Sequence, residues 1–520
     1  MTSLFLSKST IRRPMAVSVA CLMAFAAPAY ADLSATDVWG QWKEYYTKSG
    51  LEISAKETLS GGVLTVRDIT FSMPLREAEK DYGTLEIVLG EMTLADQSDG
   101  SVAISTPLQT AMSFAFSAKG EDTVKGLLDY TSSGFSMTAT GTPNDVTYAY
   151  SADTMIIALE KVLKGGDPLD VGTAKIALSA FNGGAHVITG MQTRVDGTSN
   201  IGSAEYVVDF HDPENPTKGT LKMAGAMRGI VAQSATVIPD GVDMNDFSAA
   251  LKAGYSVSAG LTYQGGNSDI RFKDRNDMFE MQTSSAGGNL KVGVDLDRVQ
   301  YDVASQTVAI KMAGSELPFP LDLSADTVGM ALSLPLTAKD TTQDFGASIT
   351  MNGVALPEQI WAMGDPSGML AREPLTIAAA ISGTGKLLID LTDEKQMMKL
   401  GQTGGLPAMI ESVKLESLKI KGAGAEITAT ADLKVDNAAM SPLGPFPNVF
   451  GVADLRLMGV KALIETLTKM GIVPMGQGMM VSGMASELGV EVTGPDDLAA
   501  KITMTEQGMF DVNGKPIPLK

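Results

Sequence analysis

The sequence predicts a mainly β protein built from large antiparallel sheets, either curved or stacked as a sandwich, in an elongated molecule with a few short helices at the sheet ends. From Leu51 onward, apolar and polar residues alternate with a period of two, which places one face of a strand in a core. Glycine-rich turn signals separate these segments at short intervals, as in hairpins and meanders. Helical periodicity is confined to a few stretches, so an antiparallel architecture follows.

Prolines and turn residues mark the ends of the alternating segments. The clearest segment begins at Val63 and ends before Pro74, whose nitrogen cannot donate to a strand ladder. We expect strands over residues 63–73, 84–89, 91–94, 101–106, 113–118, 134–140, 173–179, 204–210, 289–296, 307–312, 376–381, 413–421 and 425–435. The glycines at 61–62, 182–184, 265–267 and 287–288 are expected to form turns between strands.

Four segments have helical signals. Residues 38–49 carry Trp39, Trp42, Tyr45 and Tyr46 at roughly helical spacing, which predicts a starting helix that packs this aromatic face on the first sheet. The other segments are 243–253, which Asp243 would cap, 356–363 and 459–470. We expect these helices to close sheet ends rather than to form a layer of their own.

Residues 1–31 form a predicted signal peptide. Three basic residues precede an apolar run over 15–27, and Ala29-Tyr30-Ala31 matches a small-x-small cleavage site. We therefore expect cleavage between Ala31 and Asp32 and a periplasmic protein. The apolar run is shorter than the roughly 18 residues that suggest a membrane span, so no integral span is expected after cleavage.

Cys21 is the only cysteine, and it lies inside the predicted signal peptide. Only the short apolar segment 15–20 precedes it, which favours a hydrophobic residue of the signal over the lipidated first residue of a lipoprotein. The chain after residue 31 is then free of cysteine, so disulfides are not expected to stabilise the fold.

The length and charge of the chain limit its organisation and its partners. We expect an N-terminal β-rich region over 32–245 and a C-terminal β-rich region over 246–520. The formal net charge is −20, and removing the three basic residues of the signal makes it −23. Nucleic-acid phosphates and anionic lipid headgroups repel such a chain, so no nucleic-acid partner is expected.

The sequence shows no motif for catalysis or for a cofactor. His186 and His211 are the only histidines, and they lack the spacing of a metal site. Asp496-Asp497 is interpreted as a loop or helix cap, and Asp295 with Asp297 is too short for a calcium loop. We therefore predict no catalytic residue, no metal ligand, no cofactor and no enzymatic activity.

Methionine is unusually frequent, with 31 residues and a cluster at Met475, Met479, Met480 and Met484. The spacing fits one face of a helix, and we interpret the cluster as apolar core filling. Two alternatives stay open. Thioether sulfur binds Cu(I), and flexible methionines can also line a surface that accepts variable apolar ligands such as acyl chains.

The stretch from Leu317 to Leu391 contains a Leu-Pro-Phe-Pro-Leu segment at 317–321, then Trp361 with Asp365 and Pro366, then Arg372 and Pro374. On these residues, of which the block from Trp361 to Pro366 is the most specific, the stretch resembles an uncharacterised proteobacterial family catalogued as domain of unknown function 2125. It implies an exported, sheet-rich envelope protein, and it supplies no reaction. More distantly, the long strands and the closing Val512-Asn513-Gly514 resemble AsmA-like envelope proteins, whose curved sheets are thought to shelter lipid chains.

These observations predict a non-enzymatic protein of the cell envelope that acts by structural interaction or by holding an apolar ligand such as a lipid. Its expected partners are therefore an apolar ligand or an envelope protein. The alternative is an envelope hydrolase that works through two carboxylates, which requires a cleft with two acidic groups about 5 to 10 Å apart.

Overall fold

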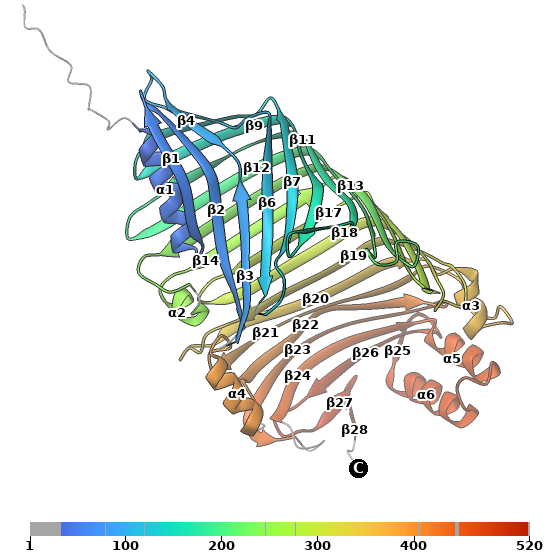
Figure 1. The fold of residues 1–520 in the computed structure, drawn as a ribbon. Helices are drawn as coiled ribbons and strands as arrows, with labels where there is room; N and C mark the ends of the chain where they lie inside the picture. The colour runs from blue at the N-terminus through green and yellow to red at the C-terminus, as the bar shows by residue number, and fades with distance from the viewer. Residues whose placement is uncertain are drawn as a thin grey trace, which may run out of the picture.

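The described strands all belong to one large antiparallel sheet. The computed structural model describes residues 33–77, 80–118, 120–244, 246–275, 277–403, 406–441 and 447–517, and these residues form six helices and 28 strands. The sheet is twisted and curved, and its first strands cross strands β14 to β19 at a steep angle (Figure 1). The predicted mainly β, antiparallel fold is confirmed.

The helices are α1 (Ala35–Lys48), α2 (Phe247–Lys252), α3 (Glu358–Gly364), α4 (Glu394–Thr403), α5 (Val460–Lys469) and α6 (Met475–Leu488). The first strands are β1 (Glu52–Ser60), β2 (Val63–Glu77), β3 (Lys80–Leu89), β4 (Met92–Asp96), β5 (Val102–Ser105), β6 (Gln109–Ala118), β7 (Val124–Ser133), β8 (Ser136–Thr142), β9 (Asp145–Lys164) and β10 (Asp167–Leu169). The middle strands are β11 (Gly172–Ile188), β12 (Gln192–His211), β13 (Gly219–Pro239), β14 (Ser256–Tyr263), β15 (Gly265–Asp274), β16 (Asp277–Ser285), β17 (Gly287–Val294), β18 (Arg298–Gly314) and β19 (Leu321–Pro335). The last strands are β20 (Gln343–Val354), β21 (Leu375–Leu387), β22 (Ala408–Gly422), β23 (Ala425–Met440), β24 (Pro447–Met458), β25 (Val490–Gly494), β26 (Asp497–Met504), β27 (Phe510–Val512) and β28 (Lys515–Ile517).

Helix α1 opens the described chain and packs on the sheet as predicted. Ser34 caps it in a capping box with Asp37, which satisfies backbone N–H groups at the helix start. Val38 and Trp39 are buried in a cluster with residues of β2, β4, β5, β8, β9 and β11. The aromatic residues that predicted the helix therefore also hold it against the sheet.

The other helices agree only in part with the sequence. Helices α3 and α5 lie close to the predicted segments. Helix α2 starts later than expected, because Asp246 rather than Asp243 accepts the capping hydrogen bond, from the Ala249 N–H at 2.9 Å. The sequence patterns predicted no helix α4, and they indicated α6 only through its methionine spacing.

Three of the expected glycine turns are wrong. Residues 182–184 lie inside β11, where Gly183 pairs with Tyr150 on one side and Ser199 on the other, residues 265–267 begin β15, and residues 287–288 begin β17. Gly183 and Gly288 make room for a tyrosine ring from the neighbouring strand. Residues 61–62 do form the turn between β1 and β2.

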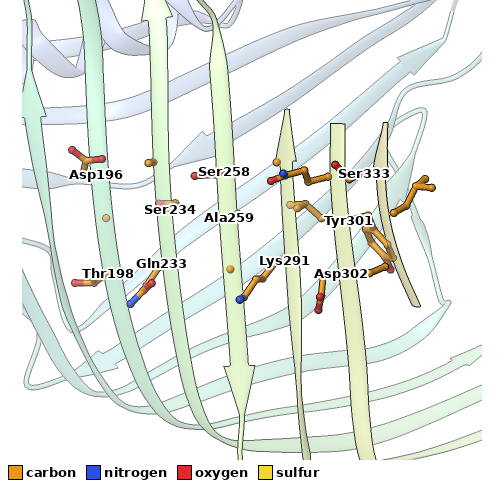
Figure 2. Close-up of a pocket in the computed structure, with 18 of the residues that line it drawn as sticks. Asp196, Thr198, Gln233, Ser234, Ser258, Ala259, Lys291, Tyr301, Asp302 and Ser333 are labelled. Carbon is orange, nitrogen blue, oxygen red and sulfur yellow. The ribbon is translucent and has the colours of Figure 1, made fainter. Parts of the chain in front are cut away.

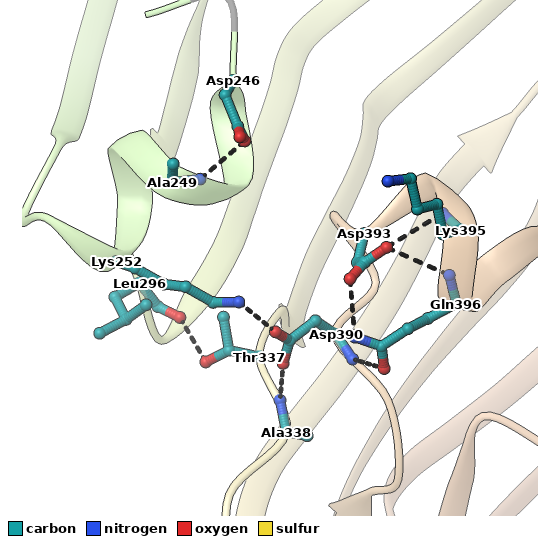
Figure 3. A network of polar contacts seen from close by, with 10 residues as sticks. All are labelled: Asp246, Ala249, Lys252, Leu296, Thr337, Ala338, Asp390, Asp393, Lys395 and Gln396. Carbon is teal, nitrogen blue, oxygen red and sulfur yellow. Dashed lines mark hydrogen bonds and ion pairs between the residues drawn. The ribbon is translucent and has the colours of Figure 1, made fainter. Parts of the chain in front are cut away.

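Hydrogen bonds continue through the region expected to separate two halves of the chain. Strand β13 pairs with β14, and a polar network ties α2 to a distant loop (Figure 3). The Lys252 Nζ lies 2.7 Å from Asp390 Oδ2, and the Ala338 N–H donates to Asp390 Oδ1 at 2.8 Å. The ion pair raises the pKa of Lys252 and lowers that of Asp390.

The predicted signal peptide, with Ala31 and Asp32, lies outside the described residues. Among the described residues, no helix combines the length and the apolar character that crossing a membrane requires.

Candidate functional site

One face of the sheet carries continuous apolar rows that cross many strands. Residues directly opposite each other in an antiparallel pair point to the same face. One row, here called the Tyr148 row, contains Tyr148, Ala185, Gly197, Ser234, Ala259, Val292, Tyr301, Leu332, Ala347, Ile381, Leu415, Ala431, Ala453, Ile502 and Val512. We call the face that carries this row the inner face.

A second row runs beside the first on the inner face. It contains Tyr150, Gly183, Ser199, Ala232, Leu261, Leu290, Val303, Met330, Ile349, Ala379, Leu418, Ala429, Leu455 and Ala500. The residues between these rows along each strand point to the opposite face, where charged pairs such as Lys222–Asp209 and Lys419–Glu426 occur. The two faces of this sheet therefore differ sharply in polarity.

Much of the inner face is not covered by another layer. Nine of its large apolar residues have exposed fractions between 36% and 49%, namely Leu290, Val292, Val328, Met330, Leu332, Ile349, Ile377, Ile381 and Ile420. Contiguous exposed apolar surface of this kind marks interaction or ligand-binding sites in soluble proteins. The inner face is thus the candidate functional site.

Helix α1 fills one end of the inner face. The Trp42 Nε1–H donates to Tyr148 Oη at 3.0 Å, and the Tyr148 hydroxyl donates to Gln41 Oε1 at 2.6 Å. Tyr46 on the same helix packs edge-on against Phe71 of β2, with ring centroids 4.8 Å apart. Burial raises the pKa of Tyr148, so its hydroxyl stays neutral and keeps both hydrogen bonds at physiological pH.

A repeated three-strand arrangement flattens tyrosine rings on the inner face. In each case a tyrosine lies opposite a glycine, which in turn lies opposite a serine. The three sets are Tyr150–Gly183–Ser199, Tyr206–Gly225–Ser268 and Tyr263–Gly288–Ser305. A Cβ on the glycine would lie 2.6 to 2.8 Å from a ring carbon, so each ring lies across its glycine.

In each set the serine hydroxyl forms a hydrogen bond with the tyrosine hydroxyl. The Oη to Oγ distances are 2.8 Å for Tyr150 with Ser199, 2.8 Å for Tyr206 with Ser268, and 3.0 Å for Tyr263 with Ser305. Each pairing satisfies the polar end of a ring inside the protein and leaves its apolar surface on the inner face. These tyrosine rings consequently lie flat against the sheet and do not fill the space above the inner face.

Cavities lie along these rows. One of about 440 Å³ is lined by Tyr150, Leu261 and Leu290, and one of about 410 Å³ by Ile176, Tyr206 and Tyr263. A third cavity, of about 990 Å³, follows the Tyr148 row from β9 to β21. Figure 2 shows polar residues beside this row, including Gln233 and the directly opposed Lys291 and Asp302. Along these strands the side chains of the Tyr148 row therefore alternate with polar ones that point to the opposite face.

Asp365, the most buried residue of the family-like motif, organises the loop after α3. Its carboxylate accepts hydrogen bonds from the backbone N–H groups of Leu370 at 2.7 Å and Met369 at 2.9 Å, and its own N–H donates to the Trp361 carbonyl. These backbone donors, Leu370 first, lower the pKa of Asp365. The motif thus includes a fully buried carboxylate with several hydrogen-bond donors.

Arg372 is brought to the same loop. It donates to the Asp365 carbonyl at 3.2 Å and forms an ion pair with Glu358 of α3. Pro366 is exposed in the loop, and Pro374 stands just before β21. The motif residues therefore meet in the connection between β20 and β21. Their contacts join residues of this loop to one another and to α3.

The titratable residues considered from the sequence have structural partners. The His186 Nε2 lies 2.7 Å from Asp145 Oδ1. Asp496 accepts from the first N–H groups of α5, and Asp497 forms a bidentate pair with Arg456 at 2.8 Å for both contacts. Within the described residues, no group of three or more His, Cys, Asp or Glu side chains is placed to hold a metal ion.

The methionine cluster is not part of the core, contrary to our interpretation. Met475, Met479, Met480 and Met484 all lie on α6 with exposed fractions from 53% to 70%. Helix α6 turns its small residues toward α5 and leaves the methionines outside. The helical spacing was therefore informative, but it did not show which side of the helix faces the protein.

The sequence pattern predicts the strands but not the site. Each apolar row is assembled from strands that are far apart in the sequence, and the register that aligns them depends on pairing. Alternation within one strand was the available signal. It showed that each strand has an apolar face, and it did not show that this face stays uncovered.

Comparison with family models, curated proteins and solved structures found no match for this chain. The resemblance to domain of unknown function 2125 and to AsmA-like proteins stays a hypothesis.

Proposed function

We propose that this protein is a non-enzymatic, exported component of the cell envelope that holds an apolar, chain-shaped ligand on the inner face of its sheet. The observation that carries the proposal is the set of apolar rows that cross the sheet while their large side chains stay more than a third exposed. A protein that only needed a core would bury these side chains against a second layer.

The shape of the site favours an extended ligand. Neighbouring strands lie about 4.8 Å apart, so a row across ten strands is roughly 45 Å long along the curve. An acyl chain matches such a surface because it is long, flexible and purely apolar. The tyrosine rings support an extended ligand because they lie flat on the sheet and leave room above it.

The predicted periplasmic location and the absence of enzymatic activity form part of the same proposal. The carboxylates considered for the alternative, hydrolytic function are already engaged, since Asp496 caps a helix and Asp497 pairs with Arg456. No specific observation favours hydrolysis over ligand holding.

The test compares substitutions on the neighbouring strands β19 and β20. Leu332 belongs to the Tyr148 row, whereas Thr350 follows Ile349 of the second row, points to the opposite face and lines none of the cavities described above. We expect Leu332→Glu to weaken binding of a fluorescent fatty acid by roughly tenfold or more, because ligand binding would desolvate the new carboxylate. Thr350→Glu is expected to bind like the wild type.

Native mass spectrometry and solvent extraction of the purified protein supply an independent measurement. We expect a co-purified lipid in the wild-type protein and less of it in Leu332→Glu. Equal probe affinity in all three proteins, or a wild-type protein that neither carries lipid nor binds the probe, would refute the proposal.

A further inference from the structure

Helix α6 has its polarity arranged in the opposite way to an ordinary surface helix. Gly478 is buried against α5, and Ser482 and Ala485 are half-buried on the same side. The large apolar residues face outward, with exposed fractions of 70% for Met479 and 59% for Met480. A helix of a soluble protein normally turns its apolar stripe inward.

The exposed surface extends beyond α6. Val490 and Val492 on β25 are 56% and 50% exposed, and Ile472 before the helix is 56% exposed. No charged residue occurs from Met470 to Ser486 in a chain that is 19% charged overall. Seventeen consecutive residues without charge reduce the desolvation cost of entering an apolar phase.

Two lysines stand at the C-terminal end of this surface. The Lys461 Nζ donates to Ser486 Oγ at 3.2 Å, and the Lys515 Nζ donates to the Glu487 carbonyl at 3.1 Å. Both belong to neighbouring elements, α5 and β28. They place positive charge beside an apolar surface on a strongly acidic chain.

The same surface lies beside the strands where the inner-face rows end. Strand β25 pairs with β26, which carries Leu498, Ala500 and Ile502 at the ends of these rows, while Val490 lies opposite Ala499 and points to the other face. Gly489, directly after α6, lies against Leu498. Figure 1 shows α5 and α6 beside this last part of the sheet.

We propose that α6 docks on the surface of a lipid bilayer, with its methionines among the acyl chains and Lys461 and Lys515 near headgroup phosphates. The 14-residue helix is about 21 Å long, too short to cross a hydrocarbon core of about 30 Å, so it lies in the plane of the interface. This inference rests on the proposed function, because docking would bring the end of the ligand-holding face to a source of acyl chains.

The test uses flotation of the purified protein with phosphatidylcholine vesicles. The double variant Met479→Glu/Met480→Glu is expected to lose roughly tenfold or more in vesicle partitioning, since two apolar side chains that would lie among the acyl chains become charged. Met191→Glu is the matched control, because Met191 is 94% exposed between β11 and β12. The control should float like the wild type, and circular dichroism should be unchanged in both variants.

Three measurements separate the outcomes. Equal flotation of wild type and double variant, or no flotation of the wild type, would overturn the docking proposal. A wild-type dimer in light scattering that the double variant abolishes, without flotation, would assign α6 to a second copy instead. Fatty-acid binding without vesicles tests the proposed function separately, and the double variant should retain it.

Discussion

At the scale of single residues, Gly225 shows how the inner face stays open. It lies between Tyr206 on β12 and Ser268 on β15, and the tyrosine ring crosses directly over it. Any side chain at this position meets the ring 2.6 Å away, so the tyrosine must lift off the sheet. Glycine in a strand costs conformational entropy, but at this position it allows the tyrosine ring to lie flat on the inner face.

We predict that Gly225→Ala lowers the free energy of unfolding by about 1 to 3 kcal/mol, since it overpacks the space below Tyr206. In a Tyr206→Ala background the same change should cost much less, which urea denaturation of the four proteins of the cycle measures. Gly260→Ala is the control, because the nearest atom to its added Cβ is 3.8 Å away. Additive effects of the two substitutions would contradict the packing explanation.

Asp497 predicts a dependence of stability on pH. The Arg456 guanidinium, followed by the Thr493 hydroxyl, lowers the pKa of Asp497 far below its ordinary value of 3.8. The carboxylate therefore contributes stability above pH 3.8, and this contribution is lost as the pH falls further.

Accordingly, Asp497→Asn should be less stable than the wild type at neutral pH, and the difference should narrow as the pH falls to about 2.5. Urea unfolding followed by circular dichroism at several pH values gives the comparison. A stability difference that stays constant over this range would show that the charge of Asp497 is unimportant.

At the scale of elements, α1 is the helix most firmly joined to the sheet. Trp39 is 2% exposed, and its Nε1–H donates to Glu57 of β1 at 2.7 Å. Helix α6 shows the opposite case, since its large residues face away from the protein. The two helices lie near opposite ends of the described sequence. Helix α1 contributes to stability, whereas α6 forms an exposed apolar surface.

We predict that Trp39→Ala lowers the free energy of unfolding by about 3 to 5 kcal/mol, because it opens a cavity between α1 and the sheet. Met398→Ala on α4, which is 65% exposed, should change stability by less than about 0.5 kcal/mol. Chemical denaturation measures both. A small loss for Trp39→Ala would mean that α1 is not part of the cooperative core.

At the scale of the whole molecule, the two faces of the sheet differ in polarity. The outer side of the strands carries ion pairs such as Lys222–Asp209, and the inner side carries the apolar rows. Surface ion pairs of this kind add little stability. The comparison of Leu332→Glu with Thr350→Glu tests this division directly.

The sequence by itself determined the mainly β class and the position of α1, because a period of two and the spacing of Trp39 and Trp42 are local properties of the chain. Local pattern also showed that each strand has one apolar face. It failed at Gly183, where a turn was expected, since the reason for that glycine is a tyrosine on another strand.

Only the tertiary structure decided which of these faces would be covered. The alignment of Leu261, Val303 and Ile349 in one row depends on the register of strands that are distant in sequence. The exposure of the α6 methionines likewise depends on where α5 packs. Burial is set by the partners that surround a residue, and the periodicity of its own segment does not contain that information.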